Sequence, residues 1–323
     1  MHISLRSLFT LALHCLLALQ VVWADTYPNK PIRIIVPYEP GGGVDIMARL
    51  LGRNLSQVAN QNVIIENRPG GGGVVGTQAL VSANPDGYSL MLGSTSPVVI
   101  APFLVKKLSY NPSKDLQPIC LIAINPAVLL VNNNSKFNTL KDIIAEAKAH
   151  PGVLTFSSSG IGGTSHLAAS LLKVMADVEM QHVAYKGTGP ATLAVLSGEV
   201  DITFADLIAG IKFIKNGQLK PIAITSKERM PILDSVPAVS ETIPDYAAGV
   251  WTGIFAPAKT PPEIITQLNK LVNKTIKSPE MMKSLNADGV SPIGGTPQEF
   301  AKLISDESDR WGDVLKKSGV AAE

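Results

Sequence analysis

Four loops rich in glycine, serine and threonine contain the residue types best suited to bind a small anion. Each follows an expected strand and opens an expected helix. A helix N-terminus offers free backbone N–H groups and a positive dipole end, and glycine lets a ligand approach the backbone. In open α/β sheets such loops gather beyond the carboxyl ends of the strands, where ligands bind. The four loops are residues 37–45, 93–97, 157–166 and 185–191.

A purely structural explanation exists for each loop taken alone. Residues 41–43 are all glycine and can make a tight strand–helix turn, while Asp45 can complement the dipole of the following helix. The serines at 157–159 can act in turns and helix caps. Two of the loops belong to each of the two lobes that the length of the chain suggests. Together they favour a cleft that closes on a small anion.

Nucleotide binding and covalent catalysis lack their motifs. The stretch PGGGGVVG at 69–76 does not have the spacing of a dinucleotide-binding turn, and no P-loop, G-x-S-x-G elbow or H-E-x-x-H motif is present. The histidines His150, His166 and His182 are scattered along the chain. We therefore predict no catalytic residue, cofactor or metal site. The alternative is an exported enzyme that uses His166 as its base.

The elements that must position these loops alternate between strands and helices. Residues 32–36 (IRIIV) indicate a buried strand, and the next helix has apolar residues at spacings of three and four from Val44 to Val58. A second set of alternating strands and helices begins near Pro126. This order predicts an α/β architecture with a mostly parallel, doubly wound sheet.

The last part of the chain contains three clear helix starts, and one of them, at Ser278-Pro279-Glu280, is a near variant of the capping box. Thr260 and Glu263, and again Thr296 and Glu299, have the spacing of a capping box, with a proline after each threonine. The final helix has an apolar face that should dock it firmly. That face consists of Phe300, Leu303, Ile304, Trp311, Val314 and Leu315.

The first 24 residues indicate where the protein works. Arg6 precedes an apolar run from Leu8 to Val22, and the run ends in VWA, so we expect a secretory signal peptide cleaved after Ala24. The run is shorter than the roughly 20 residues of a membrane-spanning helix. No later segment is long and apolar enough to cross a membrane. We therefore predict an exported, soluble mature chain.

Composition and charge exclude several classes of partner. The chain is 46% hydrophobic and 17% charged with a net charge of +2, and it has no basic stripe of the kind that nucleic-acid binding requires. Cleavage would remove Cys15 and leave Cys120, within PICLIAI, so no internal disulfide is expected. Cys120 should be a small buried hydrophobe. The length of the mature chain suits two lobes.

Several longer stretches carry a family resemblance. They are YPNKPIRIIVPYEPGGGVDIMARLLGRNL and VIIENRPGGGGVVGTQALVSANPDGYSLMLGS in the first third, followed by GIGGTSHLA, AYKGTGPA, GEVDITFAD and VWTGIFAPAKTP. Together they resemble the Bug family, the periplasmic solute-binding receptors of tripartite tricarboxylate transporters. The resemblance spans essentially the whole mature chain, and the order PGGGVD, ENRPGGGG and YKG is specific.

This resemblance implies a fold and a role. The fold is the type II periplasmic-binding-protein fold, in which two doubly wound α/β lobes joined by crossing strands close on a ligand. We expect residues 25–125 and 247–323 to form lobe 1 and residues 126–246 to form lobe 2, with hinges near 124–126 and 246–250. The ligand would be a small organic acid (a di- or tricarboxylate, an amino acid or an aromatic acid), which a monomeric receptor delivers to membrane permease subunits. A sensing role would use the same closed state and is a further alternative.

The resemblance also implies the ligand contacts. One carboxylate would be held mainly by backbone N–H groups and water, without an arginine, and a β-branched residue at Gly42 should abolish binding. The predicted contacts are Tyr38, Pro40, Gly41, Gly42 and Gly43 in the first loop, Ser94 and Thr95 after the third strand, Ser158, Gly160, Thr164, His166, Gly187 and Thr188 in lobe 2, and Asp206.

Two positions depart from the family pattern. The sequence Phe204-Ala205-Asp206 stands where relatives commonly have Phe-Asp-Asn, so the acid is displaced by one position. Glu39 stands where relatives often have a small or basic residue. An acid there would repel a second carboxylate and favour an amino acid or a neutral amide, unless Glu39 simply faces solvent.

Overall fold

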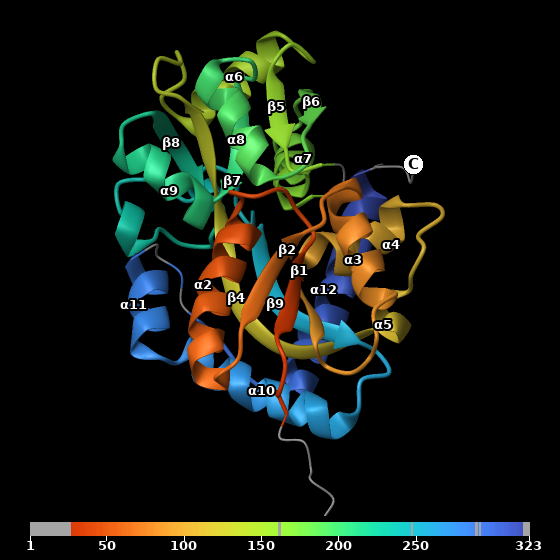
Figure 1. Ribbon diagram of the computed structural model, residues 1–323. Coiled ribbons are helices and arrows are strands. Elements are labelled where there is room, and N and C mark those ends of the chain that lie inside the picture. Colours follow the sequence, from red (N-terminus) through yellow and green to blue (C-terminus); the bar gives the residue numbers. More distant parts are fainter. Residues whose placement is uncertain (1–26, 161–162, 247, 288–289, 291, 319–323) are drawn as a thin grey trace, which may run out of the picture.

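One mixed β-sheet runs through the molecule and carries helices on both faces (Figure 1). In the part of the chain that the structure describes, this sheet has nine strands in the order β2-β1-β3-β9-β4-β7-β5-β6, with β8 also paired to β4. The predicted signal peptide, residues 1–24, lies outside the described residues. The computed structural model describes residues 27–160, 163–246, 248–287, 290 and 292–318.

The first strand group is the part of the sheet around the N-terminal strand. It contains β1 (Ile32–Val36), which pairs in parallel with β2 (Val63–Asn67) and β3 (Ser89–Ser94), and β9 (Gly249–Pro257), which runs antiparallel to β3. The helices of this region are α2 (Gly43–Ala59), η1 (Gly71–Gly73), α3 (Val74–Val81), η2 (Ser96–Ile100), α4 (Ala101–Leu104), α5 (Pro112–Asp115), α10 (Pro262–Ile276), α11 (Pro279–Ala287) and α12 (Pro297–Ser318).

The second strand group lies at the other end of the sheet. Its parallel strands are β5 (Thr155–Ser158), β6 (Gln181–Ala184) and β7 (Ile202–Asp206), and β8 (Leu219–Ile224) runs antiparallel to β4. The helices of this region are α6 (Leu140–Ala149), α7 (Thr164–Ala176), α8 (Thr188–Ser197), α9 (Leu207–Lys215), η3 (Pro231–Leu233) and η4 (Val239–Glu241).

A single long strand, β4 (Leu116–Asn132), belongs to both groups (Figure 1). Its residues up to Pro126 pair with β9, and those from Ala127 onward pair with β7 and β8. The sequence had suggested a separate strand after Pro126. Because β4 and β9 run antiparallel to their neighbours, the sheet is mixed, with its parallel pairs confined to the two ends. The run is almost continuously apolar because helices cover both of its faces.

The predicted helix faces are buried. On α2, Val44, Met47, Leu51 and Leu55 pack into the core of the first strand group, while Val58 is only half-buried. This amphipathic face fixes the direction in which the N-terminus of α2 points.

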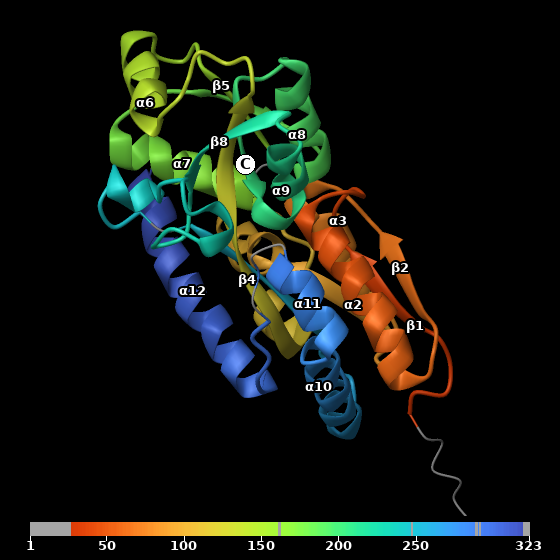
Figure 2. The ribbon, with the colours of Figure 1, turned by 90° about the vertical axis from the view of Figure 1, so that its left-hand side faces the viewer.

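The apolar face of α12 docks the last helix on the first strand group. Phe300, Trp311 and Leu315 are buried, and the Phe300 ring meets Trp251 of β9 edge-on at 5.2 Å between centroids. The side chain of Val314 lies outside the described part. Figure 2 shows α12 running along the molecule toward α7, with which it is in contact.

The two expected capping boxes have different outcomes. At α12 the box forms, because Thr296 N–H donates to Glu299 at 2.7 Å and Glu299 N–H donates to the Thr296 hydroxyl at 3.2 Å. At α10 the prediction is wrong. The helix is capped by Pro261 without a side-chain bond, and the Thr260 hydroxyl donates to the Pro257 carbonyl instead.

Candidate ligand-binding site

Tyr38 lies just after β1 and carries a buried hydroxyl at the centre of the site. This hydroxyl lies 2.8 Å from the Ser94 hydroxyl at the end of β3, and it donates to the Gly72 carbonyl at 3.3 Å. Burial raises the pKa of Tyr38 to about 12, so the phenol keeps its proton at neutral pH. Tyr38 thus links the loops that follow β1, β2 and β3.

The glycines after Tyr38 expose the N-terminus of α2. Gly41 adopts a φ of 89°, and its N–H donates to the Asp45 carboxylate at 2.9 Å. Burial disfavours ionisation of Asp45, but hydrogen bonds from Arg49, Gly41 and Asn67 hold its pKa below the usual value. Asp45 therefore stabilises the first turn of the helix, as one interpretation of the sequence had it, and does not line the cavity.

The N-terminus of α8 faces that of α2 from the second strand group. Glu39 N–H donates to the Lys186 carbonyl at 3.2 Å, which ties the two loops together. A Cβ atom added to Gly42 would lie 3.6 Å from the backbone nitrogens of both Thr188 and Gly189. Two positive helix ends, one from each strand group, therefore converge on one point.

A small cavity of about 10 Å³ lies at this point. It brings together six of the residues predicted from the sequence, namely Tyr38, Gly42, Gly43, Ser94, Thr188 and Asp206. Val44 and Ser159 also line it and were not predicted. Both are adjacent to predicted residues, on the first turn of α2 and in the loop after β5.

Asp206 ends β7 and carries a buried carboxylate in this cavity. The Thr188 hydroxyl donates to it at 3.1 Å. Burial raises the pKa of Asp206, and hydrogen bonds from Thr188 and from the Gly43 N–H oppose that rise. The contact with α2 is tight, because a Cβ atom at Gly43 would lie only 2.6 Å from Asp206 Cβ. Only glycine at position 43 permits this approach.

Two histidines that are distant in the sequence stack behind the loop after β5. The rings of His166 and His182 lie 4.2 Å apart, and His182 stacks on Phe156 at 4.8 Å. The Ser158 hydroxyl contacts His182 Nε2 at 2.5 Å. Burial lowers the pKa of His166 to about 3 and that of His182 to about 4. Both rings are therefore neutral at physiological pH, and neither lines the cavity.

The other predicted residues lie around the cavity without lining it. Thr95 accepts a hydrogen bond from the Trp251 N–H at 3.4 Å. Gly187 precedes α8 and lies against Glu39, whose nitrogen would be 3.3 Å from an added Cβ. Thr164 begins α7, but its side chain is outside the described part. The remaining members of this set are Pro40, Gly41, Ser158, Gly160 and His166.

A fifth glycine-rich loop, residues 69–76, also belongs to the site. Its Gly72 carbonyl accepts from Tyr38 and from Ser96. Gly160 of the second strand group packs against this loop. A Cβ atom added to Gly160 would lie 3.3 Å from the Gly72 nitrogen. From the sequence, this loop contributed to the family resemblance and was compared with a nucleotide-binding turn, but it was not predicted to contact the ligand. Its position after a strand and before a helix, like that of the other four, was the signal that could have identified it.

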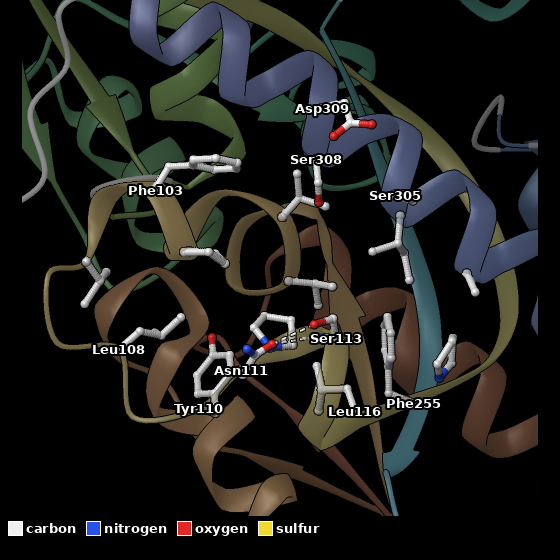
Figure 3. Close-up of a pocket in the computed structure, with 18 of the residues that line it drawn as sticks. Phe103, Leu108, Tyr110, Asn111, Ser113, Leu116, Phe255, Ser305, Ser308 and Asp309 are labelled. Carbon is white, nitrogen blue, oxygen red and sulfur yellow. Dashed lines mark hydrogen bonds between the residues drawn. The ribbon is translucent and has the colours of Figure 1, made fainter.

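A larger cavity of about 690 Å³ lies elsewhere, between α4, the following loop and α12 (Figure 3). Leu108, Leu116 and Phe255 make much of its wall, and Ser305 and Ser308 of α12 lie at its edge. It lies within the region of the first strand group alone. Because it faces only one strand group and contains none of the glycine-rich loops that precede α2 and α8, it does not match the anion-binding loops.

Chemistry other than hydrogen bonding has little support in the described residues. Within them, no group of three histidine, cysteine or acidic side chains is placed to hold a metal ion. Cys120 is buried in the core as expected, and burial raises the pKa of its thiol to about 12. None of the helices searched is long and apolar enough to span a bilayer.

Comparison with known proteins identifies the family. The model of the tripartite tricarboxylate transporter family receptor matches residues 47–320. Protein BugT of Bordetella pertussis is 36% identical over 93% of this chain and 92% of its own length. The structure of periplasmic binding protein BugD (28% identical) and that of R. palustris Rpa4515 with adipate (31% identical) each superpose with a TM-score of 0.89, covering 92% of this chain and all of theirs. The chain therefore belongs to the tripartite tricarboxylate transporter receptor family, in its Bug branch, and has the α/β fold of a periplasmic binding protein.

Proposed function

We propose that this protein captures a small carboxylate in the periplasm, between its two strand groups, and delivers it to the membrane subunits of a tripartite transporter. The relatives support the ligand class and the compartment, since one structure contains adipate and another is a periplasmic binding protein. Residues 1–24 would direct export and be removed after Ala24. The receptor would act as a monomer and would catalyse no reaction.

The observation that carries the proposal is the convergence of α2 and α8. The loop before each helix is glycine-rich, and a Cβ atom added to Gly42 would lie only 3.6 Å from the backbone nitrogens of Thr188 and Gly189. A carboxylate between these helix ends would accept hydrogen bonds from backbone N–H groups of both strand groups at once. The hydroxyls of Tyr38 and Ser94 are close enough to add further bonds. Such a site holds an anion without an arginine.

We infer that the strand groups are the cores of two lobes, residues 25–125 with 247–323 and residues 126–246, which move relative to each other. A cavity of about 10 Å³ has no room for a carboxylate with its carbon chain. The lobes must therefore separate for a ligand to enter. The crossing of β4 and β9 near residues 124–126 and 246–250 is the natural hinge, because few other elements connect the groups.

The competing reading is an enzyme that uses the histidines. Its best support is the 2.5 Å contact between the Ser158 hydroxyl and His182, which resembles a nucleophile and its base. Ser158 is fully buried, however, and a substrate would not reach it. Turnover of a bound ligand that is lost in His182→Ala or His166→Ala would favour the enzyme. A sensing role shares the binding site and differs only in the partner that recognises the closed form.

The test is a thermal-shift screen of the chain from residue 25 onward, followed by calorimetry on any compound that shifts the melting temperature. The panel would contain di- and tricarboxylates, amino acids, aromatic acids and neutral amides. A ligand that binds only the folded state raises the melting temperature. At a concentration of 100 times its Kd, it adds about 2.7 kcal/mol to the free energy of unfolding. We expect a shift with at least one carboxylate. A shift only with neutral compounds would reject the carboxylate proposal.

A further inference from the structure

Asp206 is a buried acid whose neighbours do not neutralise it. Asp206 is 6% exposed, and the groups that shift its pKa, beyond burial, are two neutral donors, the Thr188 hydroxyl and the Gly43 N–H. Arg49 of α2 pairs with Asp45, and Lys186 is exposed to solvent. An ionised carboxylate buried without a cation is costly, so a compensating group is expected.

Two more buried polar atoms beside the site lack a partner in the described structure. They are the Asn125 side-chain carbonyl on β4 and the Thr252 hydroxyl on β9, and both side chains are at most 2% exposed. Buried polar atoms are nearly always hydrogen-bonded in proteins, so each such atom needs an explanation. The Asn125 carbonyl and an ionised Asp206 can only accept hydrogen bonds, and the Thr252 hydroxyl can accept one.

The strand register places these acceptors along one side of the sheet. Thr252 is the cross-strand neighbour of Ser94, which lines the cavity, and of Ala123 on β4. Asn125 follows two residues later and therefore points to the same face as Ala123. Two residues beyond it, Ala127 is the cross-strand neighbour of Asp206. A row of acceptors thus runs from one wall of the cavity to the other, across the hinge strands.

We propose that the ligand is a 2-amino carboxylate, whose carboxylate binds the two helix ends and whose ammonium group is accepted by Asp206 and the Asn125 carbonyl. This inference rests on the proposed function and narrows its ligand class. The carboxylate and the ammonium must be close together, because the Gly43 N–H and the Asp206 carboxylate are in contact. An ammonium on the adjacent carbon satisfies that spacing. It also supplies the positive charge that Asp206 lacks.

The acceptors argue against a simple dicarboxylate. A second carboxylate next to Asp206 would place two like charges in a buried site, which raises the pKa of one of them and weakens binding. A hydroxyl would donate one hydrogen bond without neutralising the charge. The expected order of affinity on one carbon skeleton is therefore ammonium, then hydroxyl, then hydrogen.

The experiment is calorimetry with matched pairs that differ only at that carbon. The pairs are aspartate and succinate, with malate between them, glutamate and glutarate, 2-aminoadipate and adipate, phenylalanine and 3-phenylpropionate, and alanine and propionate. For the skeleton that fits, we expect the amino acid to bind at least about tenfold more tightly than its deaminated partner. This comparison uses the unaltered protein and does not depend on the folding of a variant.

The variant Asp206→Asn tests the assignment of the acceptor. It should weaken the amino acid about tenfold or more and strengthen the deaminated acid, so that the preference shrinks or reverses. The control is Asp177→Asn, which makes the same charge change at an exposed αL residue after α7, far from the cavity. That variant should keep the original preference.

Three results would overturn the inference. If a deaminated acid binds as tightly as its amino partner, the protein does not recognise the ammonium group. If Asp206→Asn raises the affinity for both compounds, Asp206 only repels the ligand. Binding of other carboxylates without any 2-amino acid would reject the inference and leave the proposed function standing. If no carboxylate of any kind binds, the proposed function fails as well.

Discussion

The two cavities of this protein differ in size by far more than tenfold, and the smaller one is the better candidate site. The larger, about 690 Å³, is a groove between α4 and α12 that faces one strand group alone. The smaller, about 10 Å³, lies where two helix N-termini from different strand groups meet. Only the smaller cavity combines backbone donors, buried hydroxyls and an uncompensated acid. Volume measures how closely the surrounding parts approach each other, whereas the groups at the surface decide which ligand is bound.

The largest expected effect distinguishes two adjacent glycines in the small cavity. Gly43→Ala should weaken ligand binding about 100-fold, because the new methyl group would meet Asp206 at 2.6 Å and hold the strand groups apart. Gly42→Ala is the matched control. Its methyl group would be in ordinary contact at 3.6 Å, and affinity should change by no more than about threefold. Equal losses in both variants would contradict the assigned contact.

The earlier expectation for Gly42 is sharpened by this geometry. A methyl group fits there, so only the larger branches of valine or isoleucine would test close approach of the ligand itself. Calorimetry of Gly42→Val beside Gly42→Ala separates the two effects. Wild-type affinity in both would remove Gly42 from the site.

A smaller effect compares one tyrosine from each cavity. Tyr38→Phe removes the hydroxyl that contacts Ser94 and Gly72, and we expect ligand affinity to fall about fivefold, or about 1 kcal/mol. Tyr110→Phe removes a hydroxyl in the large cavity that donates to the Pro97 carbonyl. This change should lower the free energy of unfolding about as much as Tyr38→Phe does, without changing ligand affinity. A loss of affinity in Tyr110→Phe but not in Tyr38→Phe would indicate that the ligand binds in the large cavity.

The histidine pair behind the small cavity should make stability sensitive to acid. The folded-state pKa of His166 is about 3, below its unfolded value of about 6.5, so the unfolded chain binds a proton first as pH falls. The protein therefore loses stability as pH falls from about 6.5 toward 3. Between pH 7 and 5 the loss from His166 is about 2 kcal/mol, and the half-buried His182 contributes less.

Denaturant unfolding of His166→Phe at pH 7 and pH 5 measures this contribution. Phenylalanine keeps a ring against His182 and Phe156 but does not titrate. We expect the difference in unfolding free energy between the two pH values to shrink. An unchanged difference would mean that carboxylates such as Glu241, whose pKa is lowered to about 2 by Arg229, dominate the acid response.

The smallest expected effect is in the large cavity. Ser305→Phe on the exposed surface of α12 would fill part of the groove. Ligand affinity should stay within about twofold of wild type. A marked loss would mean that the groove takes part in binding or follows the motion of the strand groups, since α12 also contacts α7.

Much of the local structure could be predicted from the sequence because local periodicity determines it. The strand at 32–36 has the predicted bounds. The helix starting at Thr296 has its capping box. The box at Thr260 failed because Pro261 takes the cap position and the threonine hydroxyl finds a closer carbonyl. The helix α9 and the short helices between Ser96 and Asp115 were missed, since short apolar segments have no clear period.

The candidate site was predicted less completely. Tyr38, Ser94, Thr188 and Asp206 do meet in one cavity, as expected from loops at the carboxyl ends of strands. The contact between His166 on α7 and His182 on β6 was not foreseen, because the packing of a helix against the sheet, and not sequence spacing, brings these residues together. The role of Gly72 was missed because, apart from the family resemblance, its loop was compared only with a nucleotide-binding motif.

The sequence by itself determined the elements, the glycine-rich strand ends and the kinds of donors they offer. These depend on residue type and near neighbours, which the chain order already contains. Only the tertiary structure decided that Asp206 lies against Gly43, that the Asn125 carbonyl and the Thr252 hydroxyl have no hydrogen-bond partner among the described residues, and that the large groove is separate from the small cavity. Those properties depend on which distant segments pack together and how much water they exclude. A carboxylate buried in this way without a cation favours a ligand that brings a positive charge.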